Sequence, residues 1–291
     1  MSSMEKKENR RGYMFMSPWI IGFIIFTLVP FVTTIYLSFT SVTSTIKGFE
    51  ITYVGLENYY TAFFKNTEFL PALIDFIGMI VPYTFVVVIV SFIIAIMLNS
   101  IYFGRGIFRM IYFLPVIIMS GPVMYQILDT ESAIEGVRTL EEYTDIFILQ
   151  MISSYSPAIG DFLAGVFKEL TVILWFAGIP IVLFINGLQK ISPAIYEAAK
   201  IDSANAWQIL WKITIPIIKP IMLVATIFTI AQIGTYEGNP VYLVITEATG
   251  NMSSGLGYAA TYAWVYSIII LILIGASFLI FKESVPERRN L

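Results

Sequence analysis

The chain contains no cysteine and no histidine, and only 13% of its 291 residues are charged. Without cysteine it can form neither a disulfide nor a thiolate metal site, and without histidine it lacks the commonest general base and metal ligand. The sequence has no Gly-Lys pair, so a G-x-x-x-x-G-K-[ST] phosphate-binding loop is excluded. A net charge of −3 with no basic block gives no reason to expect a nucleic-acid partner. Most classes of soluble enzyme are thereby excluded.

Apolar residues are abundant instead, at 57% of the chain. A helix that crosses the hydrocarbon core of a bilayer needs about 20 predominantly apolar residues. Six stretches are long enough: 14–39, 74–98, 107–128, 170–188, 213–234 and 258–281. The sequence therefore predicts an all-α membrane protein with six transmembrane helices in one membrane domain, 14–281.

The distribution of basic residues predicts the orientation of these spans. With both termini in the cytoplasm, the inner segments hold 13 of the 17 lysines and arginines. This bias follows the positive-inside rule. We expect cytoplasmic tails at 1–13 and 282–291, a cytoplasmic loop at 190–212, and an acidic outer segment at 129–168. That outer segment is either a solvated cap or a docking surface for an extracellular partner. A multi-pass protein of the bacterial cell membrane is predicted.

The cytoplasmic loop 190–212 is the most distinctive segment. Ser192 is a candidate N-cap for a helix that starts at Pro193, because proline's missing N–H costs nothing at that position. Small and charged residues follow, and Trp207 with Trp211 ends the loop in bulky side chains. An amphipathic helix parallel to the membrane is the simplest interpretation of this pattern.

The loop also resembles a known motif. Glu197-Ala-Ala-Lys-Ile-Asp202-Ser-Ala204, followed by Trp207, Ile213-Thr-Ile-Pro216 and Pro220, resembles the EAA motif of permeases in binding-protein-dependent ABC importers. Family members have glycine where this chain has Ser203. Because serine is strained at positive φ, we expect a more helical turn here.

Other segments resemble the carbohydrate subgroup of these permeases, the maltose and glycerol-phosphate type. They are Leu28-Val-Pro30, Leu37-Ser-Phe39, Val54-Gly-Leu-Glu-Asn-Tyr59, residues 109–115, and Gly257-Tyr-Ala-Ala260. The resemblance covers nearly the whole chain and implies a type I ABC importer permease fold with a cytoplasmic coupling helix.

The resemblance also implies partners. The coupling helix would dock on an ATPase subunit through Glu197, Ala198, Ala199, Asp202, Ser203 and Ala204. The implied assembly contains a second related permease, two cytoplasmic ATPase subunits that hold ATP and Mg²⁺, and an extracellular or lipid-anchored solute-binding protein. This chain itself is expected to be non-catalytic and to bind no cofactor or metal.

A sugar pathway would need aromatic faces and hydrogen-bonding side chains near the bilayer midplane. The candidates are Trp175, Phe176, Gln232, Thr235 and Tyr236, although aromatic residues in membrane helices more often serve packing. No charged side chain lies in the middle of a predicted span, which favours a neutral solute such as a sugar or oligosaccharide over proton coupling. Alternatives are a glycerol-phosphate permease, a stand-alone secondary transporter, or an intramembrane enzyme, for which the chain offers almost no catalytic groups.

Overall fold

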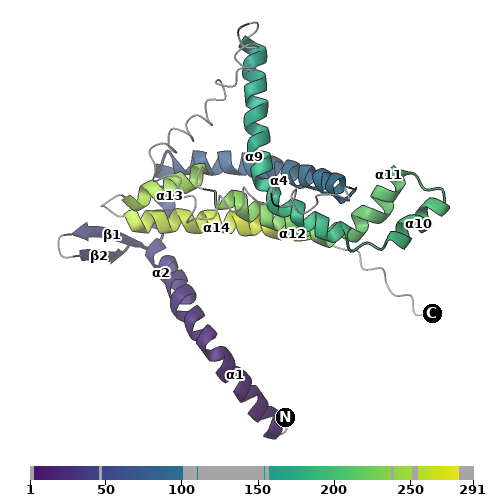
Figure 1. Cartoon of the computed structure of the whole chain (residues 1–291). Helices are drawn as coiled ribbons and strands as arrows, with labels where there is room; N and C mark the ends of the chain where they lie inside the picture. Colours follow the sequence, from purple (N-terminus) through teal and green to yellow (C-terminus); the bar gives the residue numbers. More distant parts are fainter. Residues whose placement is uncertain are drawn as a thin grey trace. The chain divides into compact units, whose positions relative to one another are not determined.

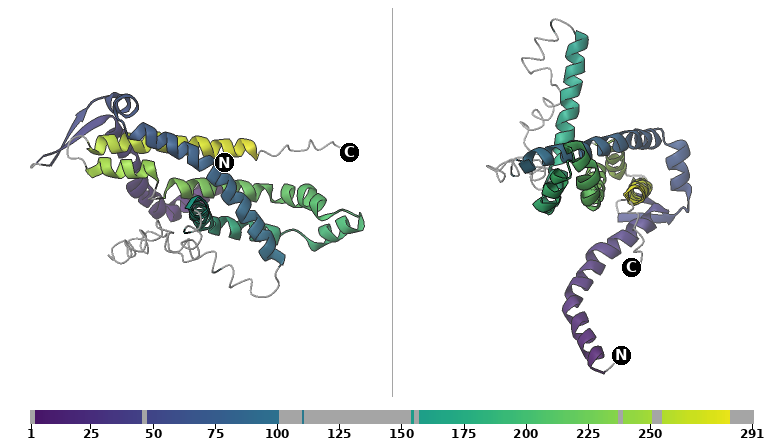
Figure 2. Two further views of the ribbon diagram at one scale, coloured as in Figure 1. Left: turned by 90° about the horizontal axis from the view of Figure 1, so that it is seen from above. Right: turned by 90° about the vertical axis from the view of Figure 1, so that its right-hand side faces the viewer.

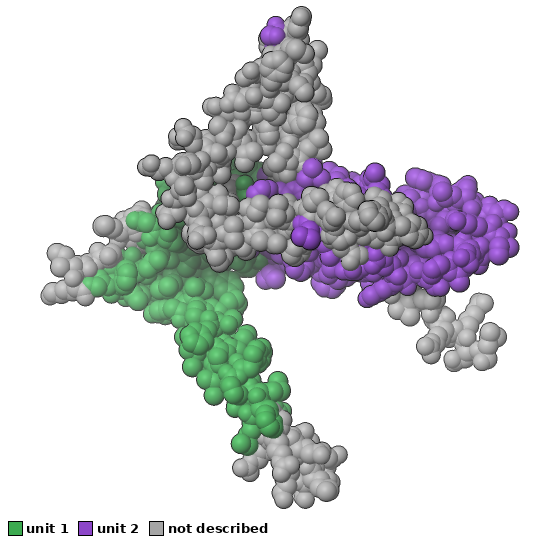
Figure 3. Space-filling view, in the orientation of Figure 1, with its two compact units in different colours: residues 1–77, 236–269 green, residues 78–235, 270–291 purple. Residues whose placement is uncertain are grey.

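The computed structural model describes residues 3–45, 48–100, 110, 154, 157–236, 239–250 and 255–281. The predicted third span, most of the acidic outer segment and the predicted C-terminal tail lie outside the described residues. The described part is mostly helical (Figure 1). It divides into two compact units, residues 1–77 with 236–269 and residues 78–235 with 270–291 (Figure 3). Two of the three boundaries between these units fall within helices α4 (Phe69–Ser100) and α14 (Gly255–Ile280), and the third lies between Thr235 and Tyr236.

Unit 1 begins with a long apolar helix. Helix α1 (Ser3–Phe23), the π-helical turn η1 (Ile24–Leu28) and helix α2 (Val29–Ser38) follow one another without a break and form one curved rod (Figure 2). Its Tyr13–Ser38 part has a mean hydropathy of 2.3 and is long enough to cross a membrane. This agrees with the predicted first span, 14–39.

A two-stranded hairpin follows, which corrects the all-α prediction. Strands β1 (Thr40–Thr45) and β2 (Gly48–Tyr53) pair antiparallel, with Thr40 opposite Tyr53. The sequence carries the signal in β-branched residues along the first strand and alternating apolar residues along the second. Gly48 has a φ of 120°, a conformation that favours glycine.

The rest of unit 1 consists of short helices and parts of two long ones, which surround a cluster of aromatic side chains. Helix α3 (Glu57–Tyr60), the π-helical turn η2 (Thr61–Lys65) and helix α13 (Pro240–Gly250) belong to it, with the outer parts of α4 and α14. Phe69 stacks on Tyr262 with ring centroids 4.3 Å apart, and Phe76 meets Tyr266 edge to face at 4.8 Å. These ring pairs join α4 to α14.

Unit 2 is built from α4, α9 (Pro157–Leu188) and α12 (Ile215–Gly234). The Ser91 hydroxyl on α4 donates to the Ala177 carbonyl on α9 at 3.4 Å. Phe92 and Phe184 continue the contact between the same two helices with ring centroids 5.4 Å apart. On the α12 side, Gly187 lets the backbone of α9 lie directly against the Ile221 side chain.

Four helices of the described part are long and apolar enough to cross a membrane: Tyr13–Ser38, Phe69–Asn99, Ala206–Gly234 and Gly255–Ile280. A fifth is counted if Ile173–Leu188 and Pro193–Ile201, bent by 67°, form one broken span. The predicted first, second, fifth and sixth spans fall on these four helices, and the predicted fourth falls on α9. Helix α9 starts at Pro157, earlier than predicted, because proline is compatible with the first helical turn. The chain is a multi-pass membrane protein.

Candidate functional site

The connection from α9 to α12 consists of short helices on the cytoplasmic side of the predicted topology (Figure 1). Helix α10 (Pro193–Ile201) is followed by α11 (Ala206–Ile209) and the π-helical turn η4 (Leu210–Thr214). Ser192 occupies the N-cap position and Pro193 starts the helix, as predicted. The Ser192 side chain makes no capping hydrogen bond, however, so it does not act as the predicted side-chain cap.

Helix α10 ends in a left-handed turn at Ser203, whose φ is 58°. The Ala204 N–H donates to the Ala199 carbonyl at 2.9 Å, and the Ser203 N–H donates to the Lys200 carbonyl at 3.1 Å. These two bonds define a Schellman motif, in which glycine is the usual left-handed residue.

The expectation of a more helical turn at Ser203 is therefore wrong. A left-handed conformation costs a residue with a side chain about 1–2 kcal/mol. The two hydrogen bonds of the motif contribute about 0.5–1.5 kcal/mol each, which is enough to offset that cost. Ser203 thus adopts the backbone conformation for which the family motif carries glycine.

The predicted contact residues on α10 and in the turn after it are divided between exposed and buried positions. Glu197, Ala198, Asp202 and Ser203 are exposed, and Ala204 is half-buried. Ala199 is only 8% exposed, so it packs within its own chain. The exposed face thus offers two carboxylates beside one small residue, which suits an Arg or Lys of a closely approaching partner.

The inner face of α10 is anchored by a side-chain hydrogen bond. The Tyr196 hydroxyl lies 3.2 Å from the Thr214 hydroxyl at the end of η4. Helix α11 starts with a capping box, in which the side chains of Asn205 and Gln208 bond each other's backbone N–H groups at 2.8 and 2.9 Å. The α10–α11 corner is therefore held at both ends and begins directly at the membrane helix α12.

Two aromatic side chains project from this corner. Trp207 and Trp211 are 67% and 53% exposed, and their rings meet edge to face at 5.5 Å. Exposed tryptophan next to a membrane span is typical of the lipid–water interface.

The five residues predicted to contact the sugar differ in whether their side chains are free to bind a ligand. Phe176 is 2% exposed and is a packing residue, and the Thr235 hydroxyl already donates to the Ala231 carbonyl at 3.0 Å. Tyr236 belongs to unit 1, whereas the other four belong to unit 2. Trp175 and Gln232 remain, on the packed helices α9 and α12.

Trp175 and Gln232 share an unusual property. The Trp175 Nε1 and the Gln232 Oε1 are buried and have no hydrogen-bond partner among the described residues. The Thr84 hydroxyl on α4, which sequence reasoning did not single out, is buried and unpartnered in the same sense. A buried polar atom without a partner costs about 1–3 kcal/mol. Such atoms are candidates for contact with a ligand or another chain.

A buried polar network in unit 1 joins three of the motif segments. Asn58 is 2% exposed, and its Nδ2 donates to the carbonyls of Ser38 at 3.0 Å and Thr40 at 2.9 Å. The Thr261 hydroxyl donates to the same Ser38 carbonyl at 3.0 Å, and the Cα of Gly257 lies against the Thr40 carbonyl. This network fixes the end of α2 against the start of α14.

Comparison with solved structures defines the class of fold. The chain is similar to a subunit of a bacterial ABC transporter that imports the acidic polysaccharide alginate, with a TM-score of 0.67 and 18% identity over 97% of this chain and 99% of that one. A second structure is the alginate ABC transporter in complex with a periplasmic protein that carries an alginate pentasaccharide. Its TM-score is 0.66, with 16% identity over 96% of each chain. The fold is that of an ABC importer permease.

Curated relatives narrow the class. The chain is 27% identical to the probable ABC transporter permease YesP of Bacillus subtilis, over 96% of this chain and 92% of that protein. It is 28% identical to the arabinooligosaccharide permease AraP of Bacillus subtilis, over 90% and 85%. It is 27% identical to the lactose permease LacF of Rhizobium radiobacter, over 94% of each. No family model matches the chain. The predicted kinship with ABC sugar permeases is confirmed.

Proposed function

We propose that this chain is the transmembrane permease subunit of an ATP-driven importer, and that it forms half of the pathway for a sugar or oligosaccharide. The observation that carries the proposal is the α10–α11 corner. It exposes Glu197, Ala198 and Asp202 between two membrane helices and ends in the turn for which the family motif carries glycine. Relatives named as arabinooligosaccharide and lactose permeases support a carbohydrate substrate.

In this proposal α10 is the coupling helix of a type I importer permease with six spans and both termini in the cytoplasm. The other half of the pathway is a second related permease. Two ATPase subunits bind ATP and Mg²⁺ and carry out hydrolysis, so this chain has no catalytic or cofactor-binding role. A solute-binding protein delivers the sugar on the outer side, as the complex with a periplasmic protein suggests for its alginate-transporting relative.

The topology is tested by labelling. Because the chain has no cysteine, single cysteines placed at Glu57 and Lys200 give no background signal. Both positions are exposed, and the charge bias puts them on opposite sides of the membrane. We expect a membrane-impermeant maleimide to label only position 57 in intact cells and position 200 only after the membrane is opened. Labelling of both in intact cells would contradict the topology.

The sugar pathway is tested at Gln232. Replacing Gln232 with Ala removes a buried acceptor that has no partner in the described part of the chain. If the transported sugar supplies that partner, the KM for uptake should rise by about tenfold, the factor for one hydrogen bond of about 1.4 kcal/mol. The measurement is uptake of radiolabelled sugar by proteoliposomes that contain the complete importer.

Gln189→Ala is the matched control, because Gln189 is exposed at the end of α9. Unchanged uptake kinetics in both Gln232→Ala and Trp175→Phe would place the pathway elsewhere. Uptake of amino acids in place of sugars would refute the substrate class.

A further inference from the structure

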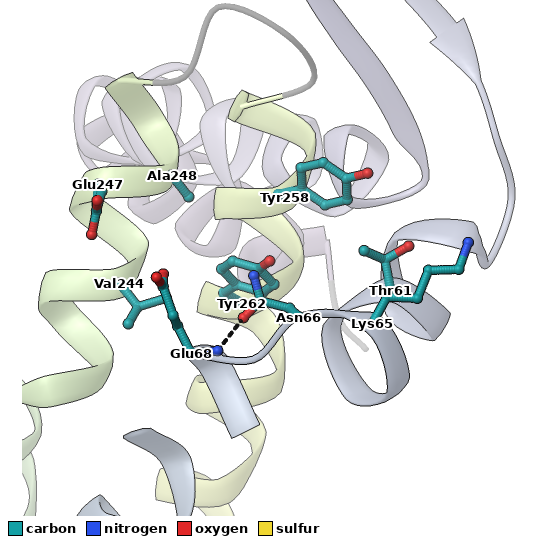
Figure 4. A pocket seen from close by; sticks show the side chains of 9 residues that line it. All are labelled: Thr61, Lys65, Asn66, Glu68, Val244, Glu247, Ala248, Tyr258 and Tyr262. Atoms are coloured by element: carbon teal, nitrogen blue, oxygen red, sulfur yellow. Dashed lines mark hydrogen bonds between the residues drawn. The ribbon is translucent and has the colours of Figure 1, made fainter. Parts of the chain in front are cut away.

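A second polar site lies in unit 1, apart from the buried atoms of α9 and α12. It is a pocket of about 320 Å³ (Figure 4). Its walls come from η2 and the residues just before α4 on one side and from α13 and α14 on the other. All of these segments lie at or beyond the outer ends of the predicted spans. The side chains that matter are Lys65, Asn66, Glu68, Glu247, Tyr258 and Tyr262.

The base of the pocket is aromatic. Tyr262 is 3% exposed, stacks on Phe69 at 4.3 Å, and lies nearly parallel to Tyr258 with ring centroids 6.3 Å apart. The Tyr262 side chain is more than nine-tenths buried and lines the pocket, and its hydroxyl is not among the buried atoms that lack a partner. The hydroxyl is therefore reachable from the pocket, where it can donate one hydrogen bond to a ligand or accept one from it.

Asn66 adds fixed donors. Its Oδ1 accepts the backbone N–H groups of Glu68 at 2.9 Å and Phe69 at 2.6 Å. These bonds lock the side-chain amide, and its NH₂ group has no partner in the part of the chain that the structure describes. The amide therefore presents two N–H donors in a set orientation beside Tyr262 (Figure 4).

Charged groups complete the wall. Glu68 and Glu247 supply carboxylate acceptors, whereas the Lys65 ammonium points away from these two carboxylates and lies 5.5 Å from the centre of the Tyr60 ring (Figure 4). The pocket thus combines acceptors, donors and a flat apolar surface within a volume at the lower end of the range for small-ligand sites.

We propose that this pocket binds one sugar unit of the incoming oligosaccharide at the outer face, before the sugar enters the membrane pathway. Each sugar hydroxyl is both a donor and an acceptor, which matches the mixed set of groups, and the C–H face of the ring suits Tyr258. The proposal rests on the proposed function and adds an entry subsite to it.

The donors distinguish a sugar from the main competing occupant, a basic side chain of the solute-binding protein. A lysine or arginine side chain presents only donors, so it would pair with Glu68 and Glu247 but would offer no acceptor to the Asn66 amide. A polyhydroxylated ring can offer acceptors to the Asn66 amide as well as donors to the two carboxylates.

The test is saturation-transfer NMR on the complete importer in nanodiscs, without the solute-binding protein. The probes are arabinotriose, lactose and maltotriose. We expect transfer to at least one probe in the wild type. Glu247→Gln should weaken its binding by about tenfold, the factor for one hydrogen bond to a charged group. Tyr258→Ala should also weaken it, because the flat surface for the sugar ring is lost. Gln232→Ala shows how much of the transfer comes from binding in the membrane pathway. Glu57→Gln is the matched control, because Glu57 is an exposed acid of the same unit outside the pocket.

The entry subsite is refuted if transfer persists unchanged in both pocket variants, or if no probe gives transfer with the wild type. If Glu247→Gln weakens association with the solute-binding protein and leaves sugar transfer unchanged, the pocket is a protein-docking site and the sugar proposal fails. Sugar uptake by the wild-type importer separates these outcomes from the proposed function. Uptake that continues while the subsite fails leaves the permease assignment in place, whereas absence of all sugar uptake refutes that assignment.

Discussion

Reversing the charge of Glu197 is expected to abolish sugar transport while the chain still reaches the membrane. Glu197 is exposed on α10, and an importer's ATPase subunit would meet it with a basic group. Glu197→Lys turns that attraction into repulsion and leaves the basic group buried without its partner, which costs about 3–5 kcal/mol. Coupled transport should fall by about a hundredfold or more. The measurements are sugar uptake and substrate-stimulated ATP hydrolysis by the reconstituted complex.

A second variant tests the same contact by shape. Ala198→Trp adds bulk on the exposed face of α10 and should have a similar effect. Ala199→Trp is unsuitable, because Ala199 is 8% exposed and a large side chain would disturb this chain's own packing. Glu57→Lys makes the same charge reversal at an exposed position on α3 and should transport normally. Full transport by Glu197→Lys and Ala198→Trp would show that α10 is only an interfacial helix.

Replacing Gly257 with Ala is expected to prevent unit 1 from folding correctly. A Cβ at this position would overlap the Thr40 carbonyl, which is rigid backbone and is held by Asn58. Overpacking costs about 1–3 kcal/mol, and each buried hydrogen bond lost from the network adds about 1 kcal/mol. The protein should be several-fold less abundant in membranes and should unfold at a lower temperature in detergent.

The same helix offers a matched control. Gly275 also lies in α14, and a Cβ there would meet no atom of the described residues within 4 Å. Gly275→Ala should keep or raise stability, because alanine favours a helix over glycine by about 1 kcal/mol. Asn58→Asp keeps the shape of the side chain but sets a carboxylate against two carbonyls, so it should resemble Gly257→Ala. Equal stability of both glycine variants would contradict the network.

The membrane helices were predictable because hydropathy is a local property of about 20 residues. The Ser203 turn was not, because its strain is offset by hydrogen bonds from Ala204 and Ser203 to the preceding turn. The hairpin had a local signal in Phe49, Ile51 and Tyr53, whose alternation was masked by the apolar character of the whole chain.

The polar sites depend on contacts between distant segments. The Thr261 hydroxyl donates to the Ser38 carbonyl across 223 positions of sequence. Only the resemblance of both segments to one family singled them out in the sequence. Glu68 and Tyr262 are likewise far apart in sequence and meet only through the packing of α4 on α14. Sequence patterns of short range contain no information about such pairs.

The first long helix has a consequence for biogenesis. Within the part of the chain that the structure describes, none of the apolar 18-residue window of Tyr13–Ser38 is buried. A helix satisfies its own backbone hydrogen bonds in lipid, so this segment requires no neighbour from its own chain to be stable there. It can therefore partition into the bilayer as soon as it has been synthesised, while the ribosome is still making the helices that follow. The nascent chain is then tethered to the membrane before any of its tertiary contacts exist.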